Sequence, residues 1–171
     1  VGAFTIVLTG AQGTFPGLWK GAKARPVKLC VVGTGYVGLV TGTCFAATGQ
    51  RVICVDKDAS KIERLLRFEI PIYEPGLEEM VKEQAEAGRL TFTTDLAAAV
   101  KDVDLAFIAV GTPPTQDGDA DLSAVFAVAK DLAKHATRDL VIVNKSTVPV
   151  GTNAQVQKLV ADAKHDIQVA S

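Results

Sequence analysis

The chain has 171 residues and a formal net charge of −1, with 48% hydrophobic and 22% charged residues. This composition can supply the core of one ordinary domain and excludes a chain that is disordered by composition. The near-neutral charge without a basic stripe argues against nucleic acid as the main partner, and no apolar run is long enough to span a membrane.

Residues 1–27 differ in composition from the rest of the chain. One short apolar run, Phe4–Leu8, is followed by several Gly and Pro residues, and the basic start and cleavage pattern of a secretory signal are missing. We interpret this stretch as an N-terminal extension, either expression-derived or translated from upstream. The alternative is that Phe4–Leu8 adds an edge strand. The domain proper is expected to span residues 28–171.

The glycine-rich stretch KLCVVGTGYVGL is the strongest signal in the chain. Its apolar run, Leu29–Val32, predicts a strand, and Gly33, Gly35 and Gly38 follow at once. A strand, G-x-G-x-x-G and a helix make the dinucleotide-binding fingerprint. The first glycine allows a tight turn, the second lets a pyrophosphate approach the backbone, and the third lets the helix pack closely. A helix continuing through Val40–Thr48 would present its N-terminus to the pyrophosphate.

A second β-type run, Arg51–Val55, ends at Asp56. This acid lies roughly 20 residues beyond the glycines, the spacing expected of the carboxylate that binds the adenosine ribose. It favours NAD over NADP because a carboxylate repels a 2′-phosphate, although Lys57 and Lys61 weaken that preference. One alternative is that this stretch is an ordinary glycine-rich turn of an α/β protein, which only mimics the fingerprint. Another is that Asp56 merely caps the next helix.

The remaining elements alternate between helix and strand. Helices are predicted at Ala59–Arg67, Leu77–Ala87, from an Asp95 cap to Val100, at Asp121–Lys134, and from a Thr152 or Asn153 cap to Lys164. Strands are predicted at Leu90–Thr94, Leu105–Val110, Leu140–Asn144 and Ile167–Ala170. This alternation predicts an α/β fold with a doubly wound parallel sheet of the Rossmann type.

Two loops follow the fourth and fifth predicted strands, Gly111–Pro114 and Lys145–Pro149. They lie at the C-terminal ends of strands, where open α/β sheets bind their ligands.

The three cysteines are Cys30, Cys44 and Cys54. Each lies in a predicted strand or helix, so we expect each to be a small buried hydrophobic residue. An odd number without a metal-binding spacing argues against a disulfide or zinc framework, and no metal site is predicted. A reducing, cytoplasmic compartment is expected.

Five ordered segments resemble the NAD-binding domain of the UDP-glucose/GDP-mannose dehydrogenase family, and especially its bacterial UDP-glucose dehydrogenases. They are GTGYVGLVTG (33–42), PIYEPGLEE (71–79), GRLTFTTD (88–95), VGTPP with DGDADL (110–122) and NKSTVPVGT (144–152). The resemblance covers Lys28–Ser171. It implies an oxidoreductase that, as a whole protein, oxidises UDP-glucose to UDP-glucuronate with two NAD⁺ and forms a homodimer.

The resemblance also implies roles for individual residues. Asp56 and Lys61 would bind the ribose, and Thr147 would hold a water during catalysis, a task that suits a hydroxyl because it both donates and accepts. The simpler alternatives are helix capping by Thr147 and turn stabilisation by Thr112. The remaining residues expected to contact the cofactor are Gly33, Gly35, Tyr36, Val37, Gly38, Val110, Gly111, Thr112, Ser146 and Thr147.

The sequence departs from the family pattern in two places. Arg67-Phe68-Glu69 stands where members usually carry a glycine before Ile-Pro-Ile, so this loop is expected to differ in shape. The sequence also ends at Ser171, before the Asn-Pro-Glu-Phe-Leu and Gly-Gly-Ser-Cys segments that carry the family's catalytic glutamate and nucleophilic cysteine. This chain alone is therefore expected to be inactive. Tyr73 and Glu74 suggest acid–base chemistry but have no assigned role.

Two alternatives to a UDP-glucose dehydrogenase stay open. Within the same enzyme class, GDP-mannose or UDP-N-acetylmannosamine dehydrogenase is the runner-up, because the family's sugar-binding residues lie mostly outside this sequence. In another class, the chain is a non-catalytic NAD-binding module.

Overall fold

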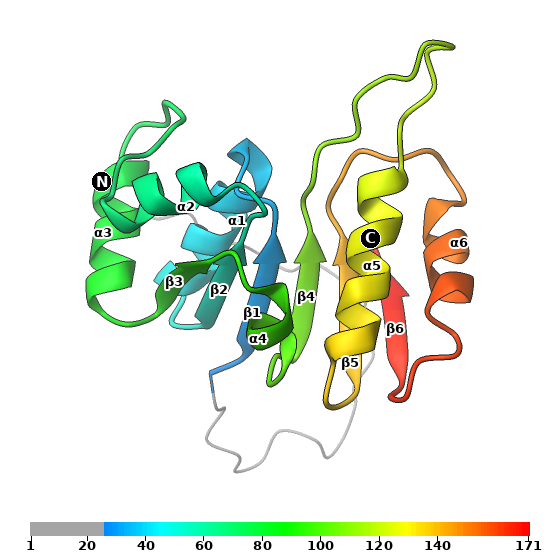
Figure 1. Ribbon diagram of the computed structural model, residues 1–171. Coiled ribbons are helices and arrows are strands. Elements are labelled where there is room, and N and C mark those ends of the chain that lie inside the picture. Colours follow the sequence, from blue (N-terminus) through cyan, green and yellow to red (C-terminus); the bar gives the residue numbers. More distant parts are fainter. Residues whose placement is uncertain (1–25) are drawn as a thin grey trace, which may run out of the picture.

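The computed structural model describes residues 26–171, in which six parallel strands form one sheet with helices on both faces (Figure 1). The sheet order is β3-β2-β1-β4-β5-β6, which is the strand order of dinucleotide-binding folds and confirms the predicted doubly wound sheet. The strands are β1 (Lys28–Val32), β2 (Arg51–Val55), β3 (Leu90–Thr93), β4 (Leu105–Ile108), β5 (Leu140–Asn144) and β6 (Ile167–Ala170). The alternative strand Phe4–Leu8 lies outside the described residues.

Within residues 26–171, six helices cover the two faces of the sheet (Figure 1). They are α1 (Tyr36–Ala47), α2 (Ala59–Leu66), α3 (Leu77–Glu86), α4 (Leu96–Val100), α5 (Ser123–His135) and α6 (Thr152–Leu159). Apolar residues of α1, α2 and α3 share one buried cluster, and those of α4, α5 and α6 share the other. No helix in the described part of the chain has both the length and the apolar character to cross a membrane.

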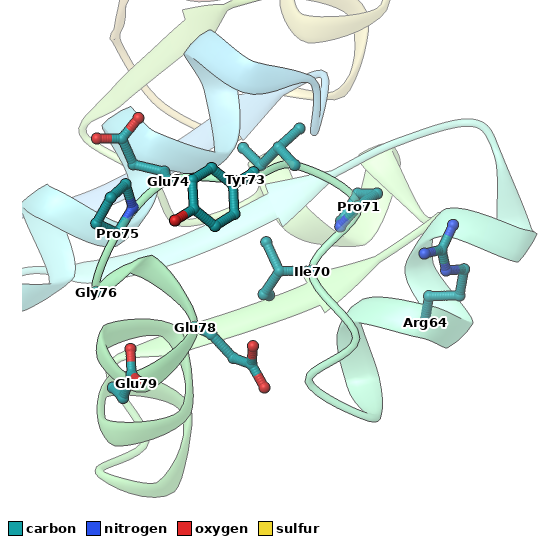
Figure 2. A pocket seen from close by; sticks show the side chains of 10 residues that line it. Arg64, Ile70, Pro71, Tyr73, Glu74, Pro75, Gly76, Glu78 and Glu79 are labelled. Carbon is teal, nitrogen blue, oxygen red and sulfur yellow. The ribbon is translucent and has the colours of Figure 1, made fainter.

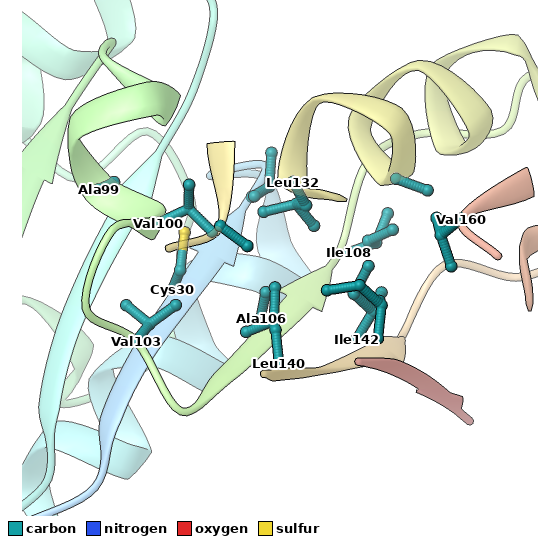
Figure 3. Packing of buried hydrophobic residues seen from close by; sticks show 14 of the residues in the cluster. Cys30, Ala99, Val100, Val103, Ala106, Ile108, Leu132, Leu140, Ile142 and Val160 are labelled. Carbon is teal, nitrogen blue, oxygen red and sulfur yellow. The ribbon is translucent and has the colours of Figure 1, made fainter. Parts of the chain in front are cut away.

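The alternation of side chains along β1 explains how one short strand serves two cores. Leu29 and Val31 belong to the cluster under α1–α3, whereas Cys30 and Val32 belong to the cluster under α4–α6. Figure 3 shows Cys30 in this second cluster, facing side chains of α4 and α5. Because both faces are covered, the central strands read as nearly unbroken apolar runs.

Two elements end at least two residues earlier than their sequences predict, and the others end within one residue of the predicted position. β4 ends at Ile108 rather than at Val110, because the Val110 carbonyl accepts a hydrogen bond from the Ser146 hydroxyl in the loop after β5 and not from a strand backbone. α6 ends at Leu159 rather than at Lys164. Tight turns over residues 160–163 then return the chain to the sheet edge, where the Gln157 side chain bonds the backbone of β6.

The helix caps follow the prediction at one helix and not at another. Asp95 caps α4, where its carboxylate accepts from the Ala98 N–H at 2.9 Å, as predicted. The predicted caps of α6 are wrong, because Gly151 holds the N-cap position with φ +91°. The Thr152 hydroxyl instead donates to the Pro149 carbonyl, and Asn153 accepts from Asn144.

The cysteines are free thiols, and two of the three are buried as predicted. Burial raises the pKa of Cys30 to about 12 and also raises that of Cys54. The prediction is wrong for Cys44, which is exposed. α1 turns Gly42, Thr43 and Ala46 toward the core, and Cys44 lies between these positions on the outer side of the helix.

The loop between α2 and α3 contains a backbone conformation that favours glycine. Phe68 has φ +60°, in the left-handed region, at the place where the family resemblance anticipates a glycine. Its side chain is partly buried and packs against the α1–α3 core. The phenylalanine contacts therefore offset the cost of an unfavourable backbone conformation.

We predict that the usual stability order of alanine and glycine is reversed at position 68. Phe68→Ala and Phe68→Gly both lose the packing, but only Gly relieves the left-handed strain. Phe68→Gly should therefore be the more stable variant by about 1 kcal/mol, measured as the free energy of unfolding in urea. A Phe68→Ala variant at least as stable as Phe68→Gly would contradict this.

Candidate functional site

The turn after β1 is constrained by the fold at its first and third glycines. Gly33 has φ +103°, and a Cβ there would lie 2.5 Å from the Ala109 carbonyl oxygen on the neighbouring strand's exit loop. A Cβ at Gly38 would overlap the Gly33 carbonyl oxygen. These two positions therefore require glycine to bring the start of α1 against the ends of β1 and β4.

The middle glycine has no such structural reason. Gly35 has φ −71°, which any residue can adopt, and a Cβ there would meet no atom of the described chain within 4 Å. Gly35 is also the N-cap of the 12-residue helix α1 and offers no side-chain cap to its free N–H groups. A glycine at this open helix N-terminus fits a diphosphate that must approach the backbone closely.

Asp56 lies at the C-terminal end of β2 and is only 8% exposed. Its Oδ2 accepts two hydrogen bonds from one residue, at 2.9 Å from the Thr34 backbone N–H and at 2.8 Å from the Thr34 hydroxyl. Its Oδ1 accepts from the Asp58 N–H at 3.0 Å, and the Lys61 ammonium lies 3.6 Å from Oδ2. The carboxylate is thus held in one orientation beside the glycine turn.

These contacts keep Asp56 ionised. Burial by itself would raise the pKa of Asp56, but the hydrogen bonds from Thr34 and Asp58 and the nearby Lys61 charge hold it below its usual value. A carboxylate has about four acceptor positions, and the protein fills three, two on Oδ2 and one on Oδ1. The remaining position on Oδ1 can accept a ribose hydroxyl.

The alternative in which Asp56 caps the following helix is wrong. Asp58 performs that task, because its Oδ1 accepts from the backbone N–H groups of Ser60 and Lys61. The Asp56 carboxylate instead accepts hydrogen bonds from Thr34 and from the Asp58 N–H.

The loops after β4 and β5 are bonded to one another at the C-terminal edge of the sheet. The Thr112 hydroxyl donates to the Thr147 carbonyl at 2.8 Å, and the Ser146 hydroxyl donates to the Val110 carbonyl at 2.7 Å. Residues separated by more than 30 positions in the sequence are thereby brought together, with Gly111 beside them. Among residues 26–171, the Thr147 hydroxyl itself has no hydrogen-bond partner and is exposed, so it caps no helix.

Tyr36 and Val37 lie in the first turn of α1 with about half of each side chain exposed. The Tyr36 hydroxyl donates to Glu74, on the loop between α2 and α3. That loop borders an open hollow of about 440 Å³, with Arg64 and Glu78 on its other sides (Figure 2). None of the residues expected to contact the cofactor lines this hollow.

Thr34 is the residue of this site that sequence reasoning missed. It is 1% exposed, and its two hydrogen bonds fix the orientation of Asp56. A hydroxyl residue between the first two glycines is the signal that could have revealed it. Within residues 26–171, no three His, Cys, Asp or Glu side chains gather closely enough to hold a metal ion.

The sequence matches a known protein family over residues 27–171. That family is described as the UDP-glucose/GDP-mannose dehydrogenase family, NAD binding domain. A UDP-glucose 6-dehydrogenase of Pseudomonas aeruginosa is 52% identical over 134 residues, which make up 78% of this chain and 30% of that relative.

Solved structures of the same class share the fold. A UDP-glucose dehydrogenase from the archaeon Pyrobaculum islandicum superposes with a TM-score of 0.82 at 40% identity, covering 90% of this chain and 37% of that one. A GDP-mannose dehydrogenase from Pseudomonas aeruginosa gives a TM-score of 0.73 at 32% identity, covering 82% and 35%. The chain therefore spans 30–37% of the length of these proteins.

The first prediction from this site separates the glycine needed for the ligand from the glycine needed for the fold. Gly35→Ala should change the free energy of unfolding by no more than about 1 kcal/mol, because the added methyl meets only open space. The same change should weaken NADH binding by about 1–3 kcal/mol, the usual cost of overpacking a close contact.

Gly38→Ala is the matched variant for this comparison and should destabilise the fold itself. Urea unfolding and NADH titration measure the two effects. Equal stability losses in both variants would contradict the distinction.

The second prediction concerns the Thr34 hydroxyl. Thr34→Val keeps the shape but removes one donor to an ionised group, so it should lower the free energy of unfolding near neutral pH by about 1.5–3 kcal/mol. Because folding lowers the pKa of Asp56, this contribution is present above the unfolded-state pKa of about 3.9 and is lost as the pH falls through the folded-state value.

The stability difference between the natural chain and Thr34→Val should therefore shrink in acid. Thr34→Ser keeps the hydroxyl and serves as the control. A difference that is independent of pH would mean that Thr34 acts by packing alone.

Proposed function

Because this chain belongs to the UDP-glucose/GDP-mannose dehydrogenase family and spans its NAD-binding domain, we propose that it is the cofactor-binding part of a UDP-glucose 6-dehydrogenase. The whole enzyme would oxidise UDP-glucose to UDP-glucuronate. The observation that carries the cofactor part of this proposal is the buried, ionised Asp56 beside the open Gly35 at the start of α1.

The chain's own residues would divide the work of binding as follows. The free N–H groups of the first turn of α1, from Tyr36 to Gly38, would bind the pyrophosphate. Asp56 and Lys61 would bind the adenosine ribose, and the carboxylate would disfavour a 2′-phosphate. NAD supplies the hydride acceptor when bound. Thr112 and Ser146 would hold the two loops that lie beside it.

Thr147 is the residue that we propose to act nearest the reaction. Its backbone is held by the Thr112 hydroxyl, while its own hydroxyl remains available. That hydroxyl can donate one hydrogen bond and accept others, so it can orient a water. The other residues that we propose beside the cofactor on these loops, Val110 and Gly111, would contribute mainly backbone groups.

The sequence identities to the relatives favour UDP-glucose as the substrate. The UDP-glucose dehydrogenases are 52% and 40% identical to this chain, whereas the GDP-mannose dehydrogenase is 32% identical. GDP-mannose and UDP-N-acetylmannosamine remain the alternative substrates, and a non-catalytic NAD-binding module remains the alternative of another class. A homodimer is proposed from the family resemblance alone, and a reducing, cytoplasmic compartment from the three free thiols.

The chain is proposed to have two parts, residues 1–27 and residues 28–171. We propose that the first stretch is an extension to the dinucleotide-binding domain. The second stretch contains every element of the described sheet.

Titration of the purified chain with NADH and NADPH tests the proposed function. NADH should bind more tightly than NADPH, and Asp56→Ala should weaken NADH binding by about 1–3 kcal/mol because it leaves ribose hydroxyls unpaired. The same change should narrow the difference between the two cofactors. Asp131→Ala removes an exposed acid on α5 and serves as the control. A folded chain that binds neither cofactor at millimolar concentration would refute the proposal.

A further inference from the structure

The segment of residues 68–76 has no place in the dinucleotide fingerprint. It joins α2 to α3 and forms one side of the 440 Å³ hollow (Figure 2). Its Tyr73 is 92% exposed, while Ile70 and Ile72 are partly buried against the α1–α3 core. The segment is therefore anchored by apolar contacts on one side and open to solvent on the other.

One polar side-chain contact connects this segment to the glycine turn. Within the described chain, the other polar side-chain contacts of the segment are local, because Glu69 accepts hydrogen bonds from Arg67 and forms an ion pair with Arg64 at the end of α2. Only Glu74 reaches beyond α2 and α3, the helices that flank the segment, because it accepts from the Tyr36 hydroxyl of α1 across 38 positions of sequence. Figure 2 shows the Glu74 carboxylate directed away from the hollow, toward the ribbon of α1.

Tyr36 is the first residue of α1, directly after Gly35. Its backbone N–H belongs to the free donors of the helix N-terminus, while its phenol extends to Glu74. The position of the 68–76 segment is therefore coupled to the first turn of α1, which is the part of the chain proposed to bind the pyrophosphate.

The charge of Glu74 cannot explain a favourable contribution to cofactor binding. A carboxylate near the start of α1 repels a diphosphate, since like charges oppose one another even through water. Any gain that Glu74 brings to binding must come from the hydrogen bond that it accepts. Its carboxylate also raises the pKa of Tyr36, because it stabilises the protonated phenol.

We propose that Glu74 is a positioning residue, which holds the 68–76 segment and the Tyr36 side chain in the arrangement that binds the dinucleotide. This inference rests on the proposed NAD-binding function. Of the two residues whose sequence suggested acid–base chemistry, Tyr73 and Glu74, the proposal assigns a role only to Glu74. That role is structural and involves no acid–base chemistry.

The experiment compares Tyr36→Phe, Glu74→Met and the double variant with the natural chain, because methionine keeps the length of the Glu74 side chain and removes its acceptor oxygens. Tyr73→Phe and Glu79→Met are the controls, since each changes an exposed residue of the same type beside the hollow. Amide hydrogen exchange in residues 70–76 and NADH titration are measured for each protein. NMR of isotope-labelled tyrosine follows Tyr36 in a Tyr73→Phe background, because the chain has only two tyrosines.

Each single variant should increase exchange in the segment and weaken NADH binding, both by roughly 3- to 10-fold, the value of one hydrogen bond. The double variant should be no worse than either single variant, because both remove the same contact. Glu74→Met should also lower the pKa of Tyr36, because it removes both the hydrogen bond and the charge that raise it. The two control variants should behave like the natural chain.

Three results would overturn the proposal. They are exchange rates in the variants equal to those of the controls, effects that add in the double variant, and tighter NADH binding by Glu74→Met. The last result would show that charge repulsion, not positioning, dominates at Glu74. Exchange and tyrosine titration need no cofactor, so a folded natural chain that fails to bind NADH would refute the proposed function separately from the Tyr36–Glu74 contact.

Discussion

The close approach between the start of α1 and the ends of β1 and β4 is the constraint on which the site depends. It is possible only because Gly33 and Gly38 lack side chains. Gly33 donates its N–H to the Val55 carbonyl at 2.7 Å, so the same turn is also fixed to the end of β2. The free N–H groups of α1, the carboxylate of Asp56 and the exit of β4 are consequently brought to one edge of the sheet.

The strand order determines what else can reach that edge. β1 and β4 are neighbours in the sheet, and the helices that follow them, α1 and α5, lie on opposite faces. A crevice forms at such a reversal in the order, and the loops after the strands border it. In Figure 1 the loop between β4 and α5 extends beyond the arrowheads of the strands. Its bond from Thr112 to Thr147 then joins the exits of β4 and β5.

At the N-terminal ends of the strands, polar groups bond to one another and stabilise the fold. Arg138 donates to the Asp104 carboxylate at 2.7 Å and to the Asp102 carbonyl, while Asp104 accepts from the Lys28 N–H. These bonds connect the beginnings of β1, β4 and β5. The polar groups that form them bond to one another. At the C-terminal edge, by contrast, Gly35, Thr147 and one position on Asp56 remain available, as a binding site requires.

Local patterns determined the elements and the kind of site. The apolar runs, the spacing of the glycines and the placing of Asp56 predicted the parallel sheet and the dinucleotide turn, because strand and turn preferences act over a few residues. Element ends were less certain, as β4 and α6 show, since hydrogen bonds from distant loops decide where a ladder or helix stops. Only the tertiary structure decided which side chains form hydrogen bonds with residues 22 to 38 positions away in the sequence. Thr34 with Asp56 is the shortest of these separations, and Tyr36 with Glu74 is the longest. Those contacts depend on how the crossovers place α1 and the loops in space, and no local preference records that arrangement.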